Sequence, residues 1–332
     1  MRKLLLVKLF LCANPYLIVF FPMLQANGLS SSEILSAISI GTIVMIAGDG
    51  MTSYFVDKFG PKRPVIAASF IQALTILLLS VCSTYELLIL FEILMGLSFP
   101  AIYGADSKWL KMLAPSDNNR EKLNQNIFWV SQLVSAVLGC LLLHFPVFLC
   151  IFNALLYMIG AFLCLKLEDA APRSGSARYS MQSHSFKLTG SWKSIFIYGF
   201  LMGSVAISSW FLQAESSKYT HSLYLFSFLQ IAGSVLSLTG SLIKANIQKI
   251  WIGLALSSIL LYPVFGLSGW SYGIWLAIGI GLLARGAIGV LSRNKVLGAL
   301  DSSGPVATIN FFLGGWAKVV QALLLLGLSS FK

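Results

Sequence analysis

Four ionisable side chains lie inside long apolar runs of this 332-residue chain, namely Asp49, Glu92, Arg285 and Lys318. If these runs cross a bilayer, each charge costs at least about 2.5–3.5 kcal/mol near its centre and should face a partner or a hydrated cavity. A carboxyl group that loses water favours its neutral form, so Asp49 and Glu92 are candidates for proton binding. Arg285 keeps its charge and offers a planar fork, which suits a carboxylate or phosphate group of a solute. The four residues are therefore candidates for substrate binding or proton coupling.

Three of these charges also have a simpler interpretation. Asp49 could be a hydrated acid near the inner membrane face, and Glu92 could reach the outer interface. Arg285 could extend towards the cytoplasm, because long basic side chains bury their stems and keep their heads in water. Lys318 lies thirteen residues past Pro305, which places it near the middle of its run at about 1.5 Å per residue.

The apolar runs indicate a membrane protein. The chain is 57% hydrophobic and only 11% charged, with a mean hydropathy of +0.82, whereas a soluble domain has roughly 25% charged residues. A spanning helix needs about 20 apolar residues, and the runs are too long for the strands of a membrane barrel. We predict an all-α polytopic bundle of about eleven transmembrane helices. The predicted segments are 9–26, 33–56, 64–82, 86–106, 123–144, 147–165, 194–213, 223–243, 250–268, 271–291 and 305–328.

The first run begins like a signal peptide, with Met1-Arg2-Lys3 before a row of leucines. It continues past Asn14-Pro15 without a small-residue cleavage site, so we predict an uncleaved first helix. Uncharged polar residues inside the runs, such as Asn14 and Gln132, are predicted to bond neighbouring helices.

Lysines and arginines gather in every second gap between the segments. Nineteen of the 23 lie in such gaps, beginning with Arg2, Lys3 and Lys8 before the first segment. The positive-inside rule then places the N-terminus in the cytoplasm, with the chain in the inner or plasma membrane of the cell. Topology alone accounts for the net charge of +11, so we predict no nucleic-acid partner.

One long polar stretch, residues 166–193, interrupts the apolar pattern. It is basic, carries serine, glycine and proline, and is predicted to be a cytoplasmic linker. It divides the chain into an N-terminal bundle of six helices, residues 1–165, and a C-terminal bundle of about five helices, residues 194–332.

The gap between the second and third segments carries a compact charged motif, in which a glycine can make the tight turn of a two-helix hairpin. The motif residues are Asp57, Lys58, Gly60, Lys62 and Arg63. Through them the chain resembles the major facilitator superfamily, whose loop at this place reads Gly-x-x-x-Asp-Arg/Lys-x-Gly-x-Arg/Lys-Arg/Lys. Ser53 stands where glycine is usual. Asp106, in Gly104-Ala105-Asp106-Ser107, is similar to the end of helix four in bacterial members.

This resemblance implies a transporter fold of two helical bundles and a role for several residues. The motif acid Asp57 would brace the halves in the outward-facing state, at the start of the eleventh helix. Helices four and ten would line the transport path and carry Glu92 and Arg285. Helices two and eleven would meet between the halves, so that Lys318 pairs with Asp49 in one state. Members usually have twelve helices, and the last has no counterpart among the eleven predicted segments.

From these observations we predict a secondary transporter of a small solute, a metabolite or drug-like compound, that works by alternating access as a monomer coupled to protons. No nucleotide-binding loop and no metal-ligand spacing of cysteines occurs, so no cofactor is expected. Two alternatives stay open. A chain without transport activity could act as a binding partner or sensor. A membrane-embedded enzyme is disfavoured because His144, His184 and His221 are scattered.

Overall fold

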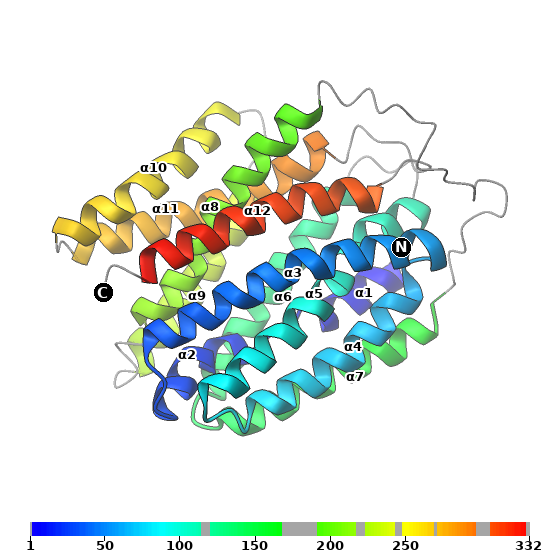
Figure 1. Ribbon diagram of the computed structural model, residues 1–332, viewed down its shortest axis with the longest axis horizontal. Helices are drawn as coiled ribbons and strands as arrows, with labels where there is room; N and C mark the ends of the chain where they lie inside the picture. Colours follow the sequence, from blue (N-terminus) through cyan, green and yellow to red (C-terminus); the bar gives the residue numbers. More distant parts are fainter. Residues whose placement is uncertain are drawn as a thin grey trace.

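The computed structural model describes residues 2–113, 120–167, 191–216, 223–242, 248–268, 271–296 and 306–329. Every regular element in these ranges is an α-helix, as the sequence predicted (Figure 1). The helices are α1 (Arg2–Leu11), α2 (Tyr16–Ala26), α3 (Ser31–Phe59), α4 (Lys62–Leu79), α5 (Tyr85–Leu113), α6 (Arg120–Leu141), α7 (Pro146–Leu165), α8 (Ser191–Ser216), α9 (Leu223–Leu242), α10 (Gln248–Ser268), α11 (Ser271–Val296) and α12 (Val306–Ser329).

Within the described residues, 6 helical stretches are long and apolar enough to cross a membrane. The chain is therefore a multi-pass membrane protein. Most of the predicted linker, residues 168–190, lies outside the described ranges.

The first predicted segment, 9–26, differs most from the structure. It belongs to two helices, α1 and α2, which are separated by residues 12–15. Pro15 has no N–H with which to continue a helix, and it disfavours helical geometry at the residue before it. A neighbouring helix satisfies a carbonyl group at the break, because Gln132 Nε2 donates to Cys12 O at 2.9 Å. The stretch Lys3–Ala26 is therefore one candidate membrane span, as predicted, but its helix is interrupted at residues 12–15, which was not predicted from the sequence.

The same span contains Lys8, which the charge pattern placed in the gap before the first segment. The structure buries this side chain in α1, where it is 7% exposed and donates to Asn124 Oδ1 of α6. The apolar stretch begins as early as Lys3, so Lys8 is part of the span. A cation at this depth needs polar partners, and α6 supplies one.

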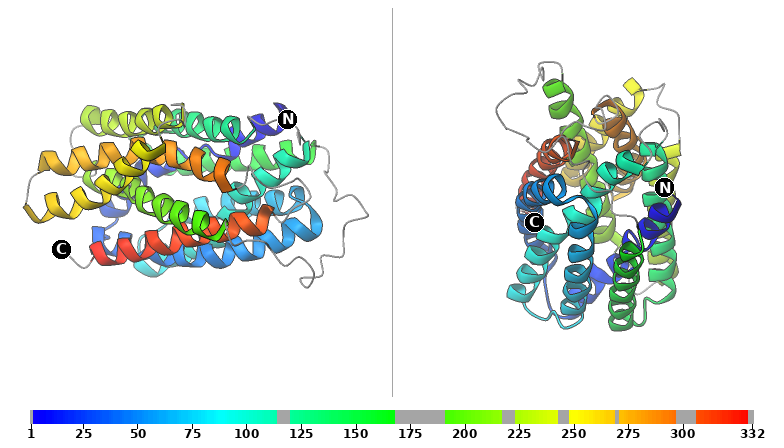
Figure 2. Two further views of the ribbon diagram at one scale, coloured as in Figure 1. Left: turned by 90° about the horizontal axis from the view of Figure 1, so that it is seen from above. Right: turned by 90° about the vertical axis from the view of Figure 1, so that its right-hand side faces the viewer.

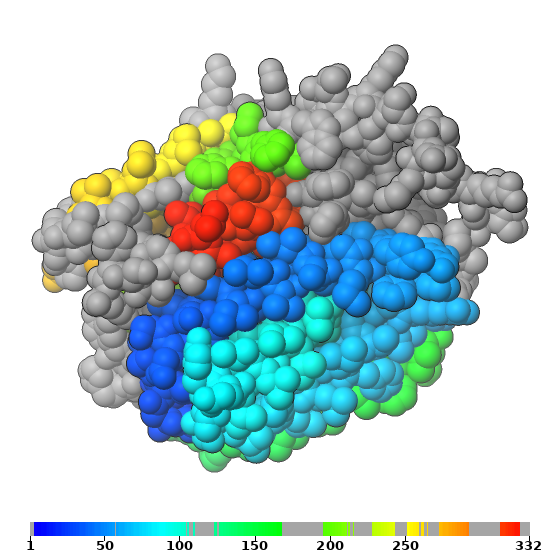
Figure 3. Space-filling model, viewed as in Figure 1, coloured from blue at the N-terminus to red at the C-terminus, as the bar shows by residue number. Residues whose placement is uncertain are grey.

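The helices form two groups with matching contacts, which we call the N-terminal half (α1–α7) and the C-terminal half (α8–α12). Within the halves, α3 packs on α5 as α9 packs on α11, and α4 packs on α5 as α10 packs on α11. The pair α1–α2 contacts α6 as α8 contacts α12. Between the halves, α3 contacts α12 and α6 contacts α9; Figure 3 shows α12 in red lying along α3 in blue. Exchanging the halves maps each of these contacts onto its counterpart.

Successive helices run between two ends of the molecule. We call the end where α7 finishes and α8 starts the linker end, and the end where α2 turns into α3 the Gly28 end. At that turn Gly28 has a φ of 95°, and Ser30 begins α3 with a capping box to Glu33. The chain starts at the linker end, and α12 finishes at the Gly28 end (Figure 2).

Glycines let helices inside each half approach closely. In the N-terminal half, a Cβ at Gly48 of α3 would overlap the backbone oxygen of Gly96 on α5. In the C-terminal half, a Cβ at Gly286 of α11 would overlap the backbone oxygen of Ser237 on α9. Small residues at such crossings are typical of membrane helices, which associate through close packing. In both halves, therefore, a glycine allows close packing of the helices at the corresponding crossing.

The halves share an apolar core at the Gly28 end. One cluster of buried residues joins the N-terminal half to Ile207 and Leu212 of α8 and Leu325 of α12, which lie in the parts of these helices nearest that end. Phe20 of α2 also contacts Trp210 of α8, with ring centroids 6.4 Å apart. Towards the linker end, the described side chains of α8, α10, α11 and α12 form a separate cluster of their own. Apolar contact between the described parts of the halves is thus concentrated at the Gly28 end.

Candidate functional site

The charged pair Asp49 and Lys318 joins the two halves. Lys318 Nζ of α12 donates to Asp49 Oδ2 of α3 at 2.5 Å. The side chains are 17% exposed for Lys318 and 12% for Asp49, so each charge satisfies the other in a place with little water. The pairing predicted from sequence is present, and its role in transport stays a proposal.

Glycines hold α12 in the position that this pair requires. A Cβ at Gly203 of α8 would overlap the backbone oxygen of Ala317, the residue before Lys318. Facing α3, a Cβ at Gly314 would lie 3.6 Å from Asp49 Oδ2, which is an ordinary contact. Helix α12 is therefore packed backbone to backbone on α8, with Lys318 directed at the carboxylate on α3.

Glu92 of α5 is buried inside the N-terminal half. Its side chain is 8% exposed, and no hydrogen bond or ion pair joins it to another described residue. Its carboxylate fills the space that Gly41 of α3 leaves open, because a Cβ at Gly41 would overlap Glu92 Oε2. The acid therefore lies in the crossing of α3 and α5.

Arg285 of α11 reaches a residue of the N-terminal half. Its guanidinium carbon lies 5.3 Å from the ring centroid of Trp129 on α6, within the range of a cation–π contact. No carboxylate pairs with Arg285 in the described part of the chain. The indole N–H of Trp129, a side chain only 5% exposed, has no acceptor there either. The N–H groups of the Arg285 guanidinium and of the Trp129 indole, which belong to different halves, thus lie close together without an acceptor among the described residues.

A row of aromatic rings continues from Trp129 into the N-terminal half, and no sequence pattern pointed to it. Ring centroids are 4.9 Å apart between Trp129 and Phe128, 5.9 Å between Phe128 and Tyr103, and 3.9 Å between Tyr103 and Phe99. Phe99, Tyr103 and Phe128 are only partly buried. We call these four residues the aromatic row. Only the packing of α5 on α6 brings them together.

A polar network attaches the aromatic row to the break between α1 and α2. Asn14 Nδ2 donates to the Tyr103 hydroxyl at 2.5 Å, and the Tyr157 hydroxyl donates to Asn14 Oδ1 at 2.6 Å. The backbone N–H of Asn14 donates to Ser135 Oγ at 2.8 Å. These contacts confirm that Asn14 bonds neighbouring helices, and they fix the broken first span to α5, α6 and α7.

The charged motif between α3 and α4 forms the predicted tight turn. Gly60 ends α3 with a φ of 81°, which a residue with a side chain rarely adopts. Lys62 Nζ donates to Leu167 O just after α7 at 2.7 Å, and Lys58 lies 5.3 Å from the ring centroid of Tyr54. These contacts of the motif cations are all within the N-terminal half.

Three motif positions contribute less. Arg63 is exposed near the start of α4. The side chains of Asp57 and Asp106, in α3 and α5, lie outside the described part of the structure. The brace between Asp57 and the start of α12 therefore stays a prediction.

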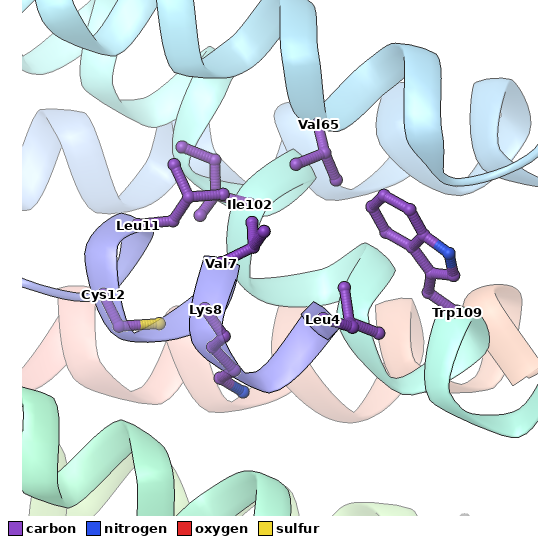
Figure 4. A pocket seen from close by; sticks show the side chains of 8 residues that line it. All are labelled: Leu4, Val7, Lys8, Leu11, Cys12, Val65, Ile102 and Trp109. Carbon is purple, nitrogen blue, oxygen red and sulfur yellow. The ribbon is translucent and has the colours of Figure 1, made fainter. Parts of the chain in front are cut away.

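A small cavity beside α1 is not a solute site. Its lining residues are Leu4, Val7, Lys8, Leu11, Cys12, Val65, Ile102 and Trp109 (Figure 4). The cavity measures about 20 Å³, which is room for about one water molecule. The candidate site is instead built from Asp49, Lys318 and Arg285, which contact the opposite half, and from the aromatic row that begins at Trp129.

No protein-family model matches the chain, and no curated protein sequence matches it significantly. Solved structures do match it over nearly its whole length. The human organic anion transporter MFSD10 (TETRAN) aligns with a TM-score of 0.67 at 14% identity, over 99% of this chain and 93% of that one. The nucleoside transporter NupG aligns with a TM-score of 0.65 at 13% identity, over 97% of this chain and 89% of that one. A variant of the E. coli fucose:proton symporter FucP aligns with a TM-score of 0.60 at 12% identity, over 99% and 96%. At such low identities the likeness establishes the fold, which is that of major facilitator superfamily transporters.

Proposed function

We propose that this chain is a secondary transporter that moves a small solute across the membrane by alternating access, coupled to protons. The observation that carries the proposal is the Asp49–Lys318 bond, which connects the two halves at a largely dehydrated contact. In alternating access, two such halves rock against each other around a site near the middle of the membrane. A charged bond across their contact is well placed to change with that motion.

The proton step uses the chemistry of this pair. As carboxylate, Asp49 attracts the Lys318 ammonium and keeps α3 against α12. When the Asp49 carboxylate takes a proton, it loses its charge, and the ion pair is reduced to a hydrogen bond from the Lys318 ammonium to a neutral carboxyl group. The halves can then separate along α3 and α12, and loss of the proton restores the bond. Proton binding is thereby coupled to the arrangement of the halves.

Glu92 is a second place at which a proton can be held. The carboxyl group is buried between α3 and α5 and has no ionic partner among the described residues, so no cation there holds it in the charged form. Because it lies beside Gly41 of α3, a change in the α3–α5 crossing would alter its access to water. Glu92 would then take up or release a proton as that crossing moves.

The shared core at the Gly28 end supports one assignment of state. Apolar contact between the described parts of the halves is concentrated there, so this conformation would be closed at the Gly28 end. The positive-inside rule makes the linker end cytoplasmic. The conformation would therefore be closed towards the outside of the cell, in an inner or plasma membrane, with one chain forming the transporter.

The matched structures add precedents for such a function. They are transporters of an organic anion, of a nucleoside, and of fucose together with a proton. All three solutes are small, and one of the proteins is a proton symporter. These precedents support a small-solute transporter and leave the substrate of this chain to experiment.

Reconstitution tests the proposal directly. Purified protein would be placed in liposomes that contain a pH-sensitive dye, and a panel of small metabolites would be added with and without a pH gradient. We expect at least one solute to drive proton movement in the wild type and none to do so in Lys318→Ala. Absence of flux for every solute under both conditions would instead favour a non-transporting binding partner or sensor.

A further inference from the structure

We infer that Arg285 and Trp129, together with the aromatic row, bind a small organic anion that carries a planar apolar group. The inference deepens the proposed transport function by naming a substrate class, and it rests on that function for its physiological meaning. The geometry of the two residues nevertheless makes a binding prediction that can be tested without transport.

The anion part follows from the unused donors. A guanidinium has several N–H groups in a planar fork that matches a carboxylate or phosphate. Arg285 has no carboxylate partner in the described chain, and its guanidinium is held over Trp129. The indole N–H of Trp129 is buried and has no acceptor among the described residues. Buried donors without acceptors are rare, and one anionic group between these residues could satisfy both.

The two acids inside the apolar runs, Asp49 and Glu92, do not fill this role. Asp49 is engaged by Lys318 of α12. Glu92 turns its carboxylate into the α3–α5 crossing beside Gly41. Neither acid pairs with Arg285, so the positive charge of the guanidinium is available to a ligand. This charge balance favours an anion over a cation or a neutral sugar.

The planar part follows from the aromatic row. Phe128, Tyr103 and Phe99 extend from Trp129 in successive ring contacts, and these three rings are only partly buried. Aromatic faces of this kind stack on flat apolar groups, with a preference for offset or edge-to-face arrangements. A ligand whose anionic group meets Arg285 can therefore place a ring against the row. Because Arg285 is on α11 and the row is on α5 and α6, such a ligand would contact both halves.

Binding measurements with purified protein in detergent at neutral pH test this inference. The probes are benzoate, its neutral planar analogue benzamide, and acetate, which has the charge without the ring. We expect benzoate to bind the wild type at least about tenfold more tightly than either analogue, since each lacks one of the two recognition elements. Calorimetry gives the affinity, and a rise in melting temperature gives a second readout.

Variants connect the affinity to the two residues. Arg285→Gln removes the charge and should lower benzoate affinity about tenfold or more, whereas Arg285→Lys keeps the charge without the fork and should lose less. Trp129→Phe keeps an aromatic ring but removes the N–H and makes the side chain smaller. Its matched control is Trp251→Phe on α10, because Trp251 is also buried with an unpartnered N–H among the described residues but belongs to a separate cluster of the C-terminal half. We expect weaker benzoate binding in Trp129→Phe and unchanged binding in Trp251→Phe.

Several results would overturn the inference. One is equal binding of benzoate and benzamide by the wild type, and another is the absence of any benzoate binding. A third is an unchanged benzoate affinity in Arg285→Gln that is correctly folded. The outcome is separable from the transport proposal. Benzoate binding without flux of any solute would leave the site standing and remove the transport function, whereas flux that depends on Lys318 without benzoate binding would do the reverse.

Discussion

Two contacts between the halves differ in how their charges are satisfied. At the α3–α12 contact, Lys318 bonds Asp49 directly and both side chains are largely out of water. At the α6–α11 contact, Arg285 lies over Trp129 and meets no carboxylate in the described chain. In the first contact the two charges satisfy each other without a ligand. In the second contact, hydrogen-bond donors have no acceptor among the described residues. The comparison separates a contact suited to hold the halves together from one suited to receive a solute.

The energetics of buried charge explain why this difference matters. A buried pair contributes little net stability, but removal of one member leaves an uncompensated charge, which is strongly unfavourable. A charge that has no ionic partner has no such bond to lose. Substitutions at the two contacts should therefore differ in their cost to the fold.

Lys318→Ala should be the most damaging change, because it leaves the Asp49 carboxylate buried without a cation. We expect a loss of stability of about 3–5 kcal/mol, measured as a lower melting temperature of the purified protein. The double variant Asp49→Asn with Lys318→Gln removes both charges and should recover most of the loss. A double variant as unstable as Lys318→Ala would contradict this account of the pair.

Gly203→Ala should have a smaller but clear effect on the same contact. The added methyl group would overlap the backbone of Ala317, so α12 must move away from α8 and take Lys318 with it. We expect a loss of about 1–3 kcal/mol, measured by thermal unfolding. Gly253→Ala on α10 is the matched control, since nothing lies within 4 Å of a Cβ there. Equal losses in the two variants would show that the close approach of α8 and α12 is unimportant.

Arg285→Gln should cost the fold little in the absence of ligand. It removes a cation–π contact of about 0.5–2 kcal/mol and also removes a charge that has no ionic partner in the described chain, so the two effects oppose each other. We expect a melting temperature close to that of the wild type, measured under the same conditions as for Lys318→Ala. A loss as large as that of Lys318→Ala would mean that Arg285 has a structural partner and is not available to a ligand.

Glu92→Gln should have the smallest effect, because the amide has nearly the same shape and no ion pair with a described residue is lost. We expect stability equal to or slightly above that of the wild type at neutral pH, since burying a neutral group costs less than burying a charge. Thermal unfolding checks this, with Glu92→Asp as a control that keeps the acid and shortens the side chain. Strong destabilisation by Glu92→Gln would indicate a partner for the charged form.

Features set by local chemistry were predictable from the sequence. The long apolar runs located the helices, and Gly60 predicted the turn after α3. The pairing of Asp49 with Lys318 is not local, and it was predicted only because the family resemblance places the second and eleventh helices side by side. The break before α2 was missed although Asn14-Pro15 marks it, because the apolar run on both sides suggested one helix. Lys8 was placed in the gap before the first segment because it was counted with the nearby cations Arg2 and Lys3.

The contact of Arg285 with Trp129 was not predictable, because neither a sequence pattern nor the family resemblance links the two positions. The same holds for the aromatic row, whose members come from two helices. Glycine crossings such as Gly203 against Ala317 also depend on which helices become neighbours. Sequence patterns report what each segment prefers, whereas these contacts depend on how the segments pack.

The central claim is that protonation at the Asp49–Lys318 contact controls which end of the molecule is closed. Spin labels would be placed on exposed sites in a variant without its five cysteines, with Val81 and Tyr272 reporting on the Gly28 end, and Tyr54 and Leu242 on the linker end. Distances within both pairs would be measured by pulsed electron spin resonance between about pH 5 and pH 8. We predict that lowering the pH moves the two distances in opposite directions in the wild type and leaves them fixed in the Asp49→Asn, Lys318→Gln double variant. Identical pH responses in the two proteins, or no response in the wild type, would contradict the account.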